Sequence, residues 1–344
     1  MNKLQIPANS EFDSLRAMEL ANLIERAYQQ YDSHQAGQTW LPDPTQTGML
    51  TGSKTLNLDA ADVQSGKVEY KILATFYYTG FWMLKPEEVP FGFIAQRQLE
   101  NGTFGIFVVF RGTRKESEWI SDFQNRQVPF LWDENLGWVG RGLNKIYTRP
   151  NTVQPEFLIS PVEHASISKV VLDTLSACPP GSQVFVTGHS LGGALATLAT
   201  LHIKNATSFK QPTLYTFASP RVGDPTFAAH FTDLKCFRIA NSEDIVPTVP
   251  PATTKLIGED MLKPEFRGQV NDDDASDEEM LSRLSPGRFE TAKSLRQLET
   301  RFLTNTVPRK QLYQHIGMSL YFTDQRGSVS YNHNMAKTYR EALP

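Results

Sequence analysis

The sequence predicts an α/β fold with a mostly parallel central sheet, and three observations support this. Strand-like and helix-like segments alternate between residues 161 and 240, and parallel strands need a helix to carry the chain back between them. An apolar run at residues 184–186 leads directly into a helix-like run of small residues. The chain has 344 residues, of which 40% are hydrophobic, and this is ordinary for a packed globular protein. We therefore expect a single domain over residues 1–344.

The first 66 residues are expected to form an extension of that domain, made of a helix and a loop. Apolar residues recur at steps of three and four between Phe12 and Tyr31, as on a helix that buries one face. Residues 32–66 are rich in Gln, Thr, Ser, Gly and Pro, which predicts a surface segment with little regular structure. No signal peptide is recognisable at the start. We expect a cytoplasmic protein, or one exported without a cleaved N-terminal signal.

Three strands are predicted next, because aromatic and branched residues dominate three segments that are bounded by Pro or Asn-Gly. They are residues 68–82, 91–98 and 104–110. The last two are expected to pair as a hairpin.

The alternating part of the chain then predicts two helices and three strands. The helices are expected at about 161–176 and 192–205, and the strands at 183–187, 213–218 and 236–240.

Residues 255–312 depart from this alternation. They open with an acidic run and continue with apolar residues at roughly helical spacing, so they predict a partly helical insertion. After the insertion we expect two closing strands at 319–323 and 328–331, and a short final helix from His333 onward.

Charge and cysteine content exclude several classes of function. The 34 basic and 37 acidic residues leave a net charge of −3, which offers no general attraction to nucleic acid. Cys178 and Cys236 are too few for a disulfide scaffold or a Cys-only zinc site. We interpret them as two small buried apolar residues, although one bridge between them is possible. No metal site, cofactor or transmembrane segment is predicted, and the sequence leaves the oligomeric state open.

Residues 188–192 read Gly-His-Ser-Leu-Gly and match the pattern G-x-S-x-G. This pattern places a serine on a sharp turn between a strand and a helix, where only small neighbours allow the two elements to pass closely. The apolar strand before it and the small-residue helix after it supply the required context. The sequence therefore predicts Ser190 as a nucleophile at a helix N-terminus.

A serine nucleophile needs a base that is oriented by an acid, and in this fold the acid and then the histidine follow the serine. Asp244 is the favoured acid because it follows the strand at 236–240, at the edge where ligand-facing loops emerge. Asp224 and Glu243 are the alternatives. Among the seven histidines, only two follow Asp244. His333 is favoured as the base, and His315 is more simply explained as a buried structural histidine.

Six motifs occur in an order that resembles the class 3 lipases, which are α/β-hydrolases that include the fungal triacylglycerol lipases. They are VFRGT (109–113), WISD (119–122), GHSLGGALA (188–196), FASPRVG (217–223), NSEDIVP (241–247) and YQHIG (313–317). The resemblance implies the α/β-hydrolase fold and the same triad of Ser190, Asp244 and His333. It also implies an oxyanion hole formed by Thr113 and the N–H group of Leu191.

The segment at 114–124 is similar to the lid of this family. Trp119, Ile120 and Phe123 fall on one side of a helical turn. A helix here is expected to bury them when closed and to expose them to lipid when open.

From these observations we expect a hydrolase that cleaves carboxylic esters of lipids through an acyl-enzyme. A triacylglycerol lipase or carboxylesterase is the first interpretation. A phospholipase A1 and a feruloyl-type esterase are the alternatives within enzymes, and a catalytically silent lipid-binding protein is the alternative outside them.

Overall fold

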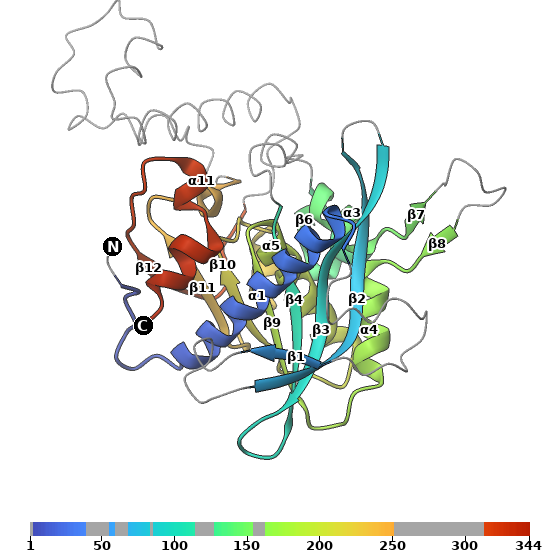
Figure 1. Ribbon diagram of the computed structural model, residues 1–344, viewed down its shortest axis with the longest axis horizontal. Coiled ribbons are helices and arrows are strands. Elements are labelled where there is room, and N and C mark those ends of the chain that lie inside the picture. Colours follow the sequence, from blue (N-terminus) through green and yellow to red (C-terminus); the bar gives the residue numbers. More distant parts are fainter. Residues whose placement is uncertain are drawn as a thin grey trace, which may run out of the picture.

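The core of the protein is an eight-stranded sheet, seen in the computed structural model (Figure 1). The structure describes residues 3–38, 55–58, 68–82, 85–113, 127–153, 162–250 and 313–344. The strand order is β1-β2-β3-β4-β9-β10-β11-β12. The strands are β1 (Thr55–Leu58), β2 (Val68–Trp82), β3 (Lys85–Gln98), β4 (Phe104–Phe110), β9 (Gln183–His189), β10 (Thr213–Phe217), β11 (Cys236–Asn241) and β12 (Met318–Phe322).

The sheet has a parallel part and an antiparallel part. The four pairings from β4 through β9, β10 and β11 to β12 are parallel. Strands β1, β2, β3 and β4 pair antiparallel in succession. The expected hairpin between β3 and β4 is confirmed, with Gly102 in its turn at a φ of 80°. The predicted α/β class with a mostly parallel sheet is confirmed as well.

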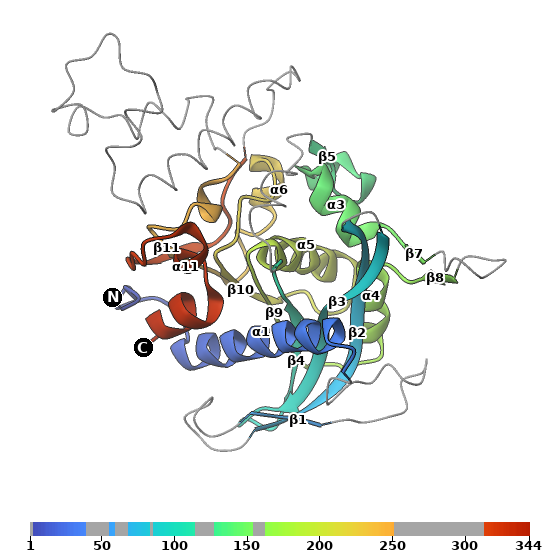
Figure 2. The ribbon, with the colours of Figure 1, turned by 45° about the horizontal axis from the view of Figure 1, so that its top comes forward.

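Helices cover both faces of the sheet (Figures 1 and 2). On one face lie α1 (Ser14–Gln35) and the π-helix η4 (Met335–Arg340), and the short helix α11 (Val329–Asn332) precedes η4 in the chain. On the other lie α3 (Arg141–Thr148), α4 (Ile167–Ser176) and α5 (Leu191–Ala206). Two separate clusters of buried apolar side chains match these two layers, one on each face of the sheet.

Several short elements connect the larger ones, and none of those between residues 127 and 153 was predicted. The connecting elements are β5 (Gln127–Pro129), η1 (Phe130–Trp132), η2 (Glu134–Leu136), β6 (Trp138–Gly140), β7 (Asn151–Val153), β8 (Val162–His164), α6 (Pro225–Ala229) and η3 (Val246–Thr248).

Two expectations for segments before residue 177 are wrong in part. Helix α1 continues to Gln35, and Thr55–Leu58 forms strand β1 beside β2, so residues 32–66 include regular structure. The helix expected from residue 161 begins at Ile167 instead, because Ser166 caps it by accepting a hydrogen bond from the Lys169 N–H at 3.2 Å. The residues just before that cap form β8 and pair with β7.

The expected closing strand at 328–331 is also wrong, because this segment is helix α11. The Ser328 side chain accepts a hydrogen bond from the Tyr331 N–H at 3.2 Å and caps the helix. A serine cap satisfies backbone groups locally, and β12 pairs with β11 alone among the described strands. The final helix begins at Met335 rather than at His333, after Asn334 as its cap.

The predicted α/β-hydrolase architecture is confirmed by this topology, with a helix directly following the central strand β9. Both cysteines are free: Cys178 is half-buried and Cys236 is buried. None of the helices in the described ranges is long and apolar enough to cross a membrane. The insertion expected at 255–312 lies outside the described residues.

Candidate active site

Ser190 occupies the sharp turn between β9 and α5. Its backbone angles are φ 58° and ψ −128°, a region that costs a non-glycine residue of order 1–3 kcal/mol. The strand order places this turn among the parallel strands, and the Ser190 N–H donates to the Phe217 carbonyl of β10 at 2.9 Å. The hydrogen bond to β10 therefore stabilises the strained conformation of Ser190, which the G-x-S-x-G pattern predicts.

The glycines around Ser190 are required by backbone packing. A Cβ on Gly188 would overlap the carbonyl group of Gly192, and a Cβ on Gly192 would overlap the carbonyl group of Arg111. These neighbours are main-chain atoms, which cannot rotate away as a side chain can. The motif therefore spaces its glycines where strand and helix come closest.

Asp244 and His333 form a buried hydrogen-bonded pair. His333 Nδ1 lies 2.6 Å from Asp244 Oδ2, and both side chains are fully buried. Asp244 also accepts hydrogen bonds from the Val246 N–H at 2.9 Å and from the Tyr339 hydroxyl at 2.6 Å. Burying a carboxylate is costly unless donors surround it. Three hydrogen-bond donors therefore surround the Asp244 carboxyl group.

This pair fixes which nitrogen of His333 is available for proton transfer. An ionised carboxylate only accepts hydrogen bonds, so Nδ1 of His333 carries a proton towards Asp244. In a neutral imidazole the other nitrogen, Nε2, then has the free electron pair. His333 is thereby oriented to accept a proton at Nε2, as the base of a serine hydrolase must.

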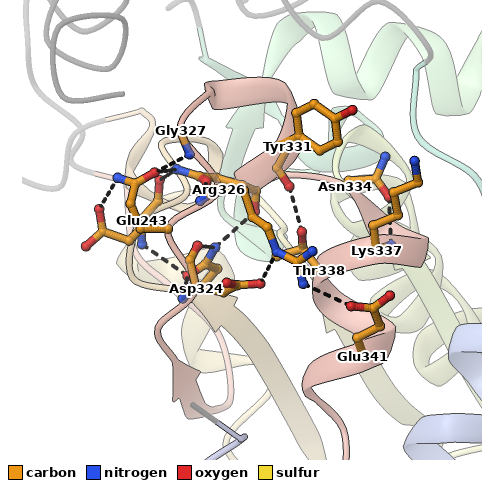
Figure 3. A network of polar contacts seen from close by, with 12 residues as sticks. Glu243, Asp324, Arg326, Gly327, Tyr331, Asn334, Lys337, Thr338 and Glu341 are labelled. Atoms are coloured by element: carbon orange, nitrogen blue, oxygen red, sulfur yellow. Dashed lines mark hydrogen bonds and ion pairs between the residues drawn. The ribbon is translucent and has the colours of Figure 1, made fainter. Parts of the chain in front are cut away.

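A network of polar contacts holds the segment that carries His333 (Figure 3). Arg326 donates to Asp324 at 2.6 Å and to Glu341 at 2.9 Å, which ties the residues before His333 to those after it. The Thr338 hydroxyl donates to the Tyr331 carbonyl at 2.6 Å. His333 therefore lies in a turn between α11 and η4 that is stabilised by these hydrogen bonds.

His189 connects the serine turn to the histidine segment. Its Nε2 donates to the His333 carbonyl at 2.8 Å, and the two ring centroids are 4.6 Å apart. In the described part of the chain the Ser190 hydroxyl is buried and has no hydrogen-bond partner. Hydrogen bonds of a catalytic site often tighten only when substrate binds. The structure thus places Ser190 next to the residue that contacts His333.

The predicted oxyanion-hole residues lie against the same turn. A Cβ on Gly112 would lie 2.9 Å from Ser190 Cβ, so the chain at 112–113 packs directly on the serine. The Thr113 hydroxyl is buried and has no hydrogen-bond partner among the described residues. Leu191 is the first residue of α5, so its N–H has no acceptor within the helix. Both donors are suited to an anionic oxygen.

Tyr28 of α1 joins these two parts of the site, and the sequence analysis did not identify it. Its hydroxyl accepts a hydrogen bond from the Gly112 N–H at 3.1 Å and lies 2.8 Å from His189 Nδ1. Because His189 Nε2 donates to a carbonyl, Nδ1 of the neutral ring accepts from Tyr28. One hydroxyl thus links the chain beside Thr113 to the residue before Ser190.

We predict that Tyr28→Phe lowers both stability and turnover. The change removes a hydroxyl that satisfies a buried N–H and a buried imidazole nitrogen, which costs about 1–3 kcal/mol in the free energy of unfolding. The expected signature is a lower kcat with little change in KM, since the oxyanion segment loses its anchor. Urea unfolding and steady-state kinetics on a soluble ester measure both.

Tyr147→Phe is the matched control for that variant. Tyr147 is fully buried and its hydroxyl lies 3.1 Å from His202 Nδ1, in contact with α5 away from the serine turn. This variant is expected to lose stability and keep its kcat. Equal losses of kcat in both variants would contradict a positioning role for Tyr28.

The alternatives to Asp244 and His333 have other partners. Asp224 caps α6 by accepting from the Phe227 N–H at 2.8 Å. Glu243 is half-buried and accepts from Gln325 at 2.9 Å. Burial and the nearby charges of Arg238 and Arg221 lower the pKa of His315 to about 3. The structure therefore brings none of these three into the Asp244–His333 pair.

Tyr339 is the second residue of the site that the sequence analysis missed. Burial and the neighbouring Asp244 raise its pKa well above the usual tyrosine value, so it stays protonated and donates. The sequence offers no signal for either tyrosine, because both occupy apolar helix positions and only the ring's polar end reaches the site.

The predicted lid residues Trp119, Ile120 and Phe123 lie outside the described residues. Among the described residues, no group of three or more His, Cys, Asp or Glu side chains is arranged to hold a metal ion.

Comparison with known proteins identifies the matching family. The family model for class 3 lipases matches residues 107–254. A phospholipase A1-II 3 of Oryza sativa subsp. japonica is 31% identical over 179 residues, which are 47% of this chain and 42% of that protein. A lipase of Rhizomucor miehei is 37% identical over 153 residues, which are 43% of this chain and 38% of that protein. The chain thus matches less than half the length of either relative.

Solved structures of fungal lipases are similar as well. A Rhizomucor miehei lipase propeptide complex is 26% identical with a TM-score of 0.47, covering 72% of this chain and 65% of that one. A lipase of Rhizopus microsporus var. chinensis is 27% identical with a TM-score of 0.45, covering 73% and 77%.

Proposed function

Because residues 107–254 belong to the class 3 lipase family, we propose that this chain hydrolyses carboxylic esters of lipids. The observation that carries the proposal is the buried hydrogen bond between His333 Nδ1 and Asp244 Oδ2, in a segment that contacts the residue before a strained serine. This is the set of groups that acyl transfer through serine requires.

The first step forms an acyl-enzyme. Ser190 Oγ attacks the ester carbonyl carbon while its proton moves to His333 Nε2, and the carbonyl electron pair moves to the oxygen. The tetrahedral intermediate then breaks the bond to the alcohol oxygen, which takes the proton back from His333. Asp244 stabilises the imidazolium that exists between these two transfers.

The second step releases the acid. A water molecule gives a proton to His333 Nε2 and attacks the acyl carbon, and the same proton returns to Ser190 Oγ as the acyl group leaves. In both steps the negative oxygen is bound by the Thr113 hydroxyl and the Leu191 N–H. Each such donor is worth about 3–4 kcal/mol in the transition state.

A lipid acyl ester is the proposed substrate, and the first candidate is a triacylglycerol. The support comes from the similar proteins, which include a Rhizomucor miehei triacylglyceride lipase. A rate that rises sharply once a triacylglycerol substrate exceeds its solubility would agree with this candidate. Full activity on dissolved short-chain esters, without such a rise, would favour a soluble carboxylesterase.

The test of the proposal uses a fluorophosphonate, which phosphorylates an activated serine. We predict that the probe labels the wild-type chain at Ser190, and that labelling stops ester hydrolysis in parallel. Ser190→Ala is expected to lose both signals, whereas Ser219→Ala, at another buried serine, is expected to keep labelling at Ser190. An unlabelled wild-type protein would favour a silent lipid-binding protein instead.

Phospholipase A1 activity is the second candidate, because several of the similar proteins are phospholipases A1 of Oryza sativa. Phosphatidylcholine with different acyl chains at its two positions separates the candidates. Release of the sn-1 chain at a rate above that for triacylglycerol would support the phospholipase. Triacylglycerol cleavage alone would reject it.

A further inference from the structure

A small cavity with a mixed polar and apolar lining lies on the α5 face of the sheet, apart from the Ser190 turn. Its lining includes Thr197 of α5, Thr216 of β10, Arg238 of β11, and the loop residues Ser219, Arg221 and His315; these six residues are the arginine cavity. Its volume is about 10 Å³, which is the space that one water-sized particle needs. The proposed reaction uses none of these residues.

Two guanidinium groups line the cavity, and no carboxylate is among the described residues that line it. Arg238 is 5% exposed, and its guanidinium donates to the Ser319 hydroxyl and, at 3.0 Å, to the Tyr321 hydroxyl. Arg221 is half-buried and donates to the carbonyl groups of Thr248 and, at 2.8 Å, Pro250. Within the described ranges, every hydrogen bond found for either guanidinium thus ends on an uncharged oxygen.

One donor of Arg238 has no acceptor. Its Nε is buried and has no hydrogen-bond partner among the described residues. A buried charged donor without a partner costs more than a neutral one. A buried ion is normally paired, so among the described residues this donor lacks the partner that a buried charge requires.

The pKa values of two groups that line the cavity are lowered by burial and by the positive charge of the arginines. Burial, and then the charge of Arg238, lower the pKa of Arg221 to about 10. The His315 ring has its pKa lowered by burial, by Arg238 and by Arg221, so it adds no charge at neutral pH. The two guanidinium groups therefore repel each other across a space that holds no described negative group.

We propose that the arginine cavity binds one monatomic anion of about the size of chloride between Arg221 and Arg238. A negative ion there accepts from the Arg238 Nε, which has no partner among the described residues, and neutralises the repulsion between one buried and one half-buried guanidinium group. The volume limits the ligand, because sulfate and phosphate have five heavy atoms each.

The bound ion acts on stability, and the proposal does not depend on the proposed function. A Cβ on Gly193 of α5 would lie 2.8 Å from Ser219 Cβ, so the cavity lies behind the helix that follows Ser190. Ligand binding to the folded state alone raises stability with concentration. Chloride should therefore raise the Tm while leaving the reaction at a low temperature unchanged.

Two measurements on the full chain test the proposal. Crystals of the wild-type protein soaked in sodium bromide should show an anomalous peak between Arg221 and Arg238. In solution, replacing gluconate by chloride at constant ionic strength should raise the Tm to a plateau. Arg238→Gln and Arg221→Gln should lose that rise, while Arg141→Gln, at an exposed arginine in α3, should keep it.

The outcomes are separable. A missing anomalous peak would overturn the proposal whatever the variants do, since that experiment needs no substitution. A Tm that sulfate raises as much as chloride would overturn the size selectivity and indicate a general salt effect. If Arg238→Gln does not fold, the Tm of Arg221→Gln and the bromide peak of the wild-type protein still test whether the cavity binds an anion.

Discussion

Replacing His333 with Ala is expected to lower kcat for ester hydrolysis by about 10⁴- to 10⁶-fold, the range found when one member of a serine triad is removed. The reason is that Nε2 of His333 is the group oriented to accept the Ser190 proton, since Nδ1 is bonded to Asp244 at 2.6 Å. A soluble p-nitrophenyl ester gives kcat directly. Circular dichroism shows whether the variant is folded.

His315→Ala is the control for that result. His315 lines the arginine cavity, and no hydrogen bond joins it to Asp244 among the described residues, so this variant is expected to retain most of the wild-type kcat. The opposite pattern, with loss in His315→Ala and activity in His333→Ala, would overturn the assignment of the base.

The second large effect is expected at Gly188, where Ala should destabilise the fold by about 4 kcal/mol or more, at the upper end for single substitutions. The new Cβ would overlap the backbone of Gly192 at the start of α5. Strand β9 cannot move away, because it is hydrogen-bonded between β4 and β10. Urea unfolding, or the yield of soluble protein, measures the loss.

Gly142→Ala is the matched control, because the same methyl group is added in an open place. A Cβ there meets no atom within 4 Å, and the residue lies inside α3. Ala is favoured over Gly in a helix by about 0.5–1 kcal/mol, so a small gain in stability is expected. A Gly188→Ala variant as stable as Gly142→Ala would show that the turn can relax.

The alternation of strands and helices was sufficient to predict the parallel half of the sheet. Each crossover of a parallel pair needs a helix, so the alternation of elements from β9 to β11 predicts that these strands run parallel, and the structure shows which strands are neighbours. The prediction failed for short elements. The segment at 328–331 has strand-like residues, but the Ser328 side chain caps it as helix α11.

Sequence spacing predicted the residues of the site that depend on local geometry. The strand, turn and helix around Ser190 are contiguous, and Asp244 follows its strand by a few residues. The steric demands at Gly188 and Gly192 also act within one turn of chain. Such features can be predicted from the sequence, because the conformation of this turn depends on residues that are close together along the chain.

By itself, then, the sequence determined the α/β class, the serine turn and a small set of acid and base candidates. Only the tertiary structure showed that His333 rather than His315 pairs with Asp244, and that Tyr28 and Tyr339 bond to the site from helices on the opposite side of the sheet from α5. The physical reason is separation along the chain. Asp244 and His333 are 89 residues apart, and Tyr28 and His189 are 161 apart. Contacts of that range depend on how buried faces pack together, and residue spacing does not encode this.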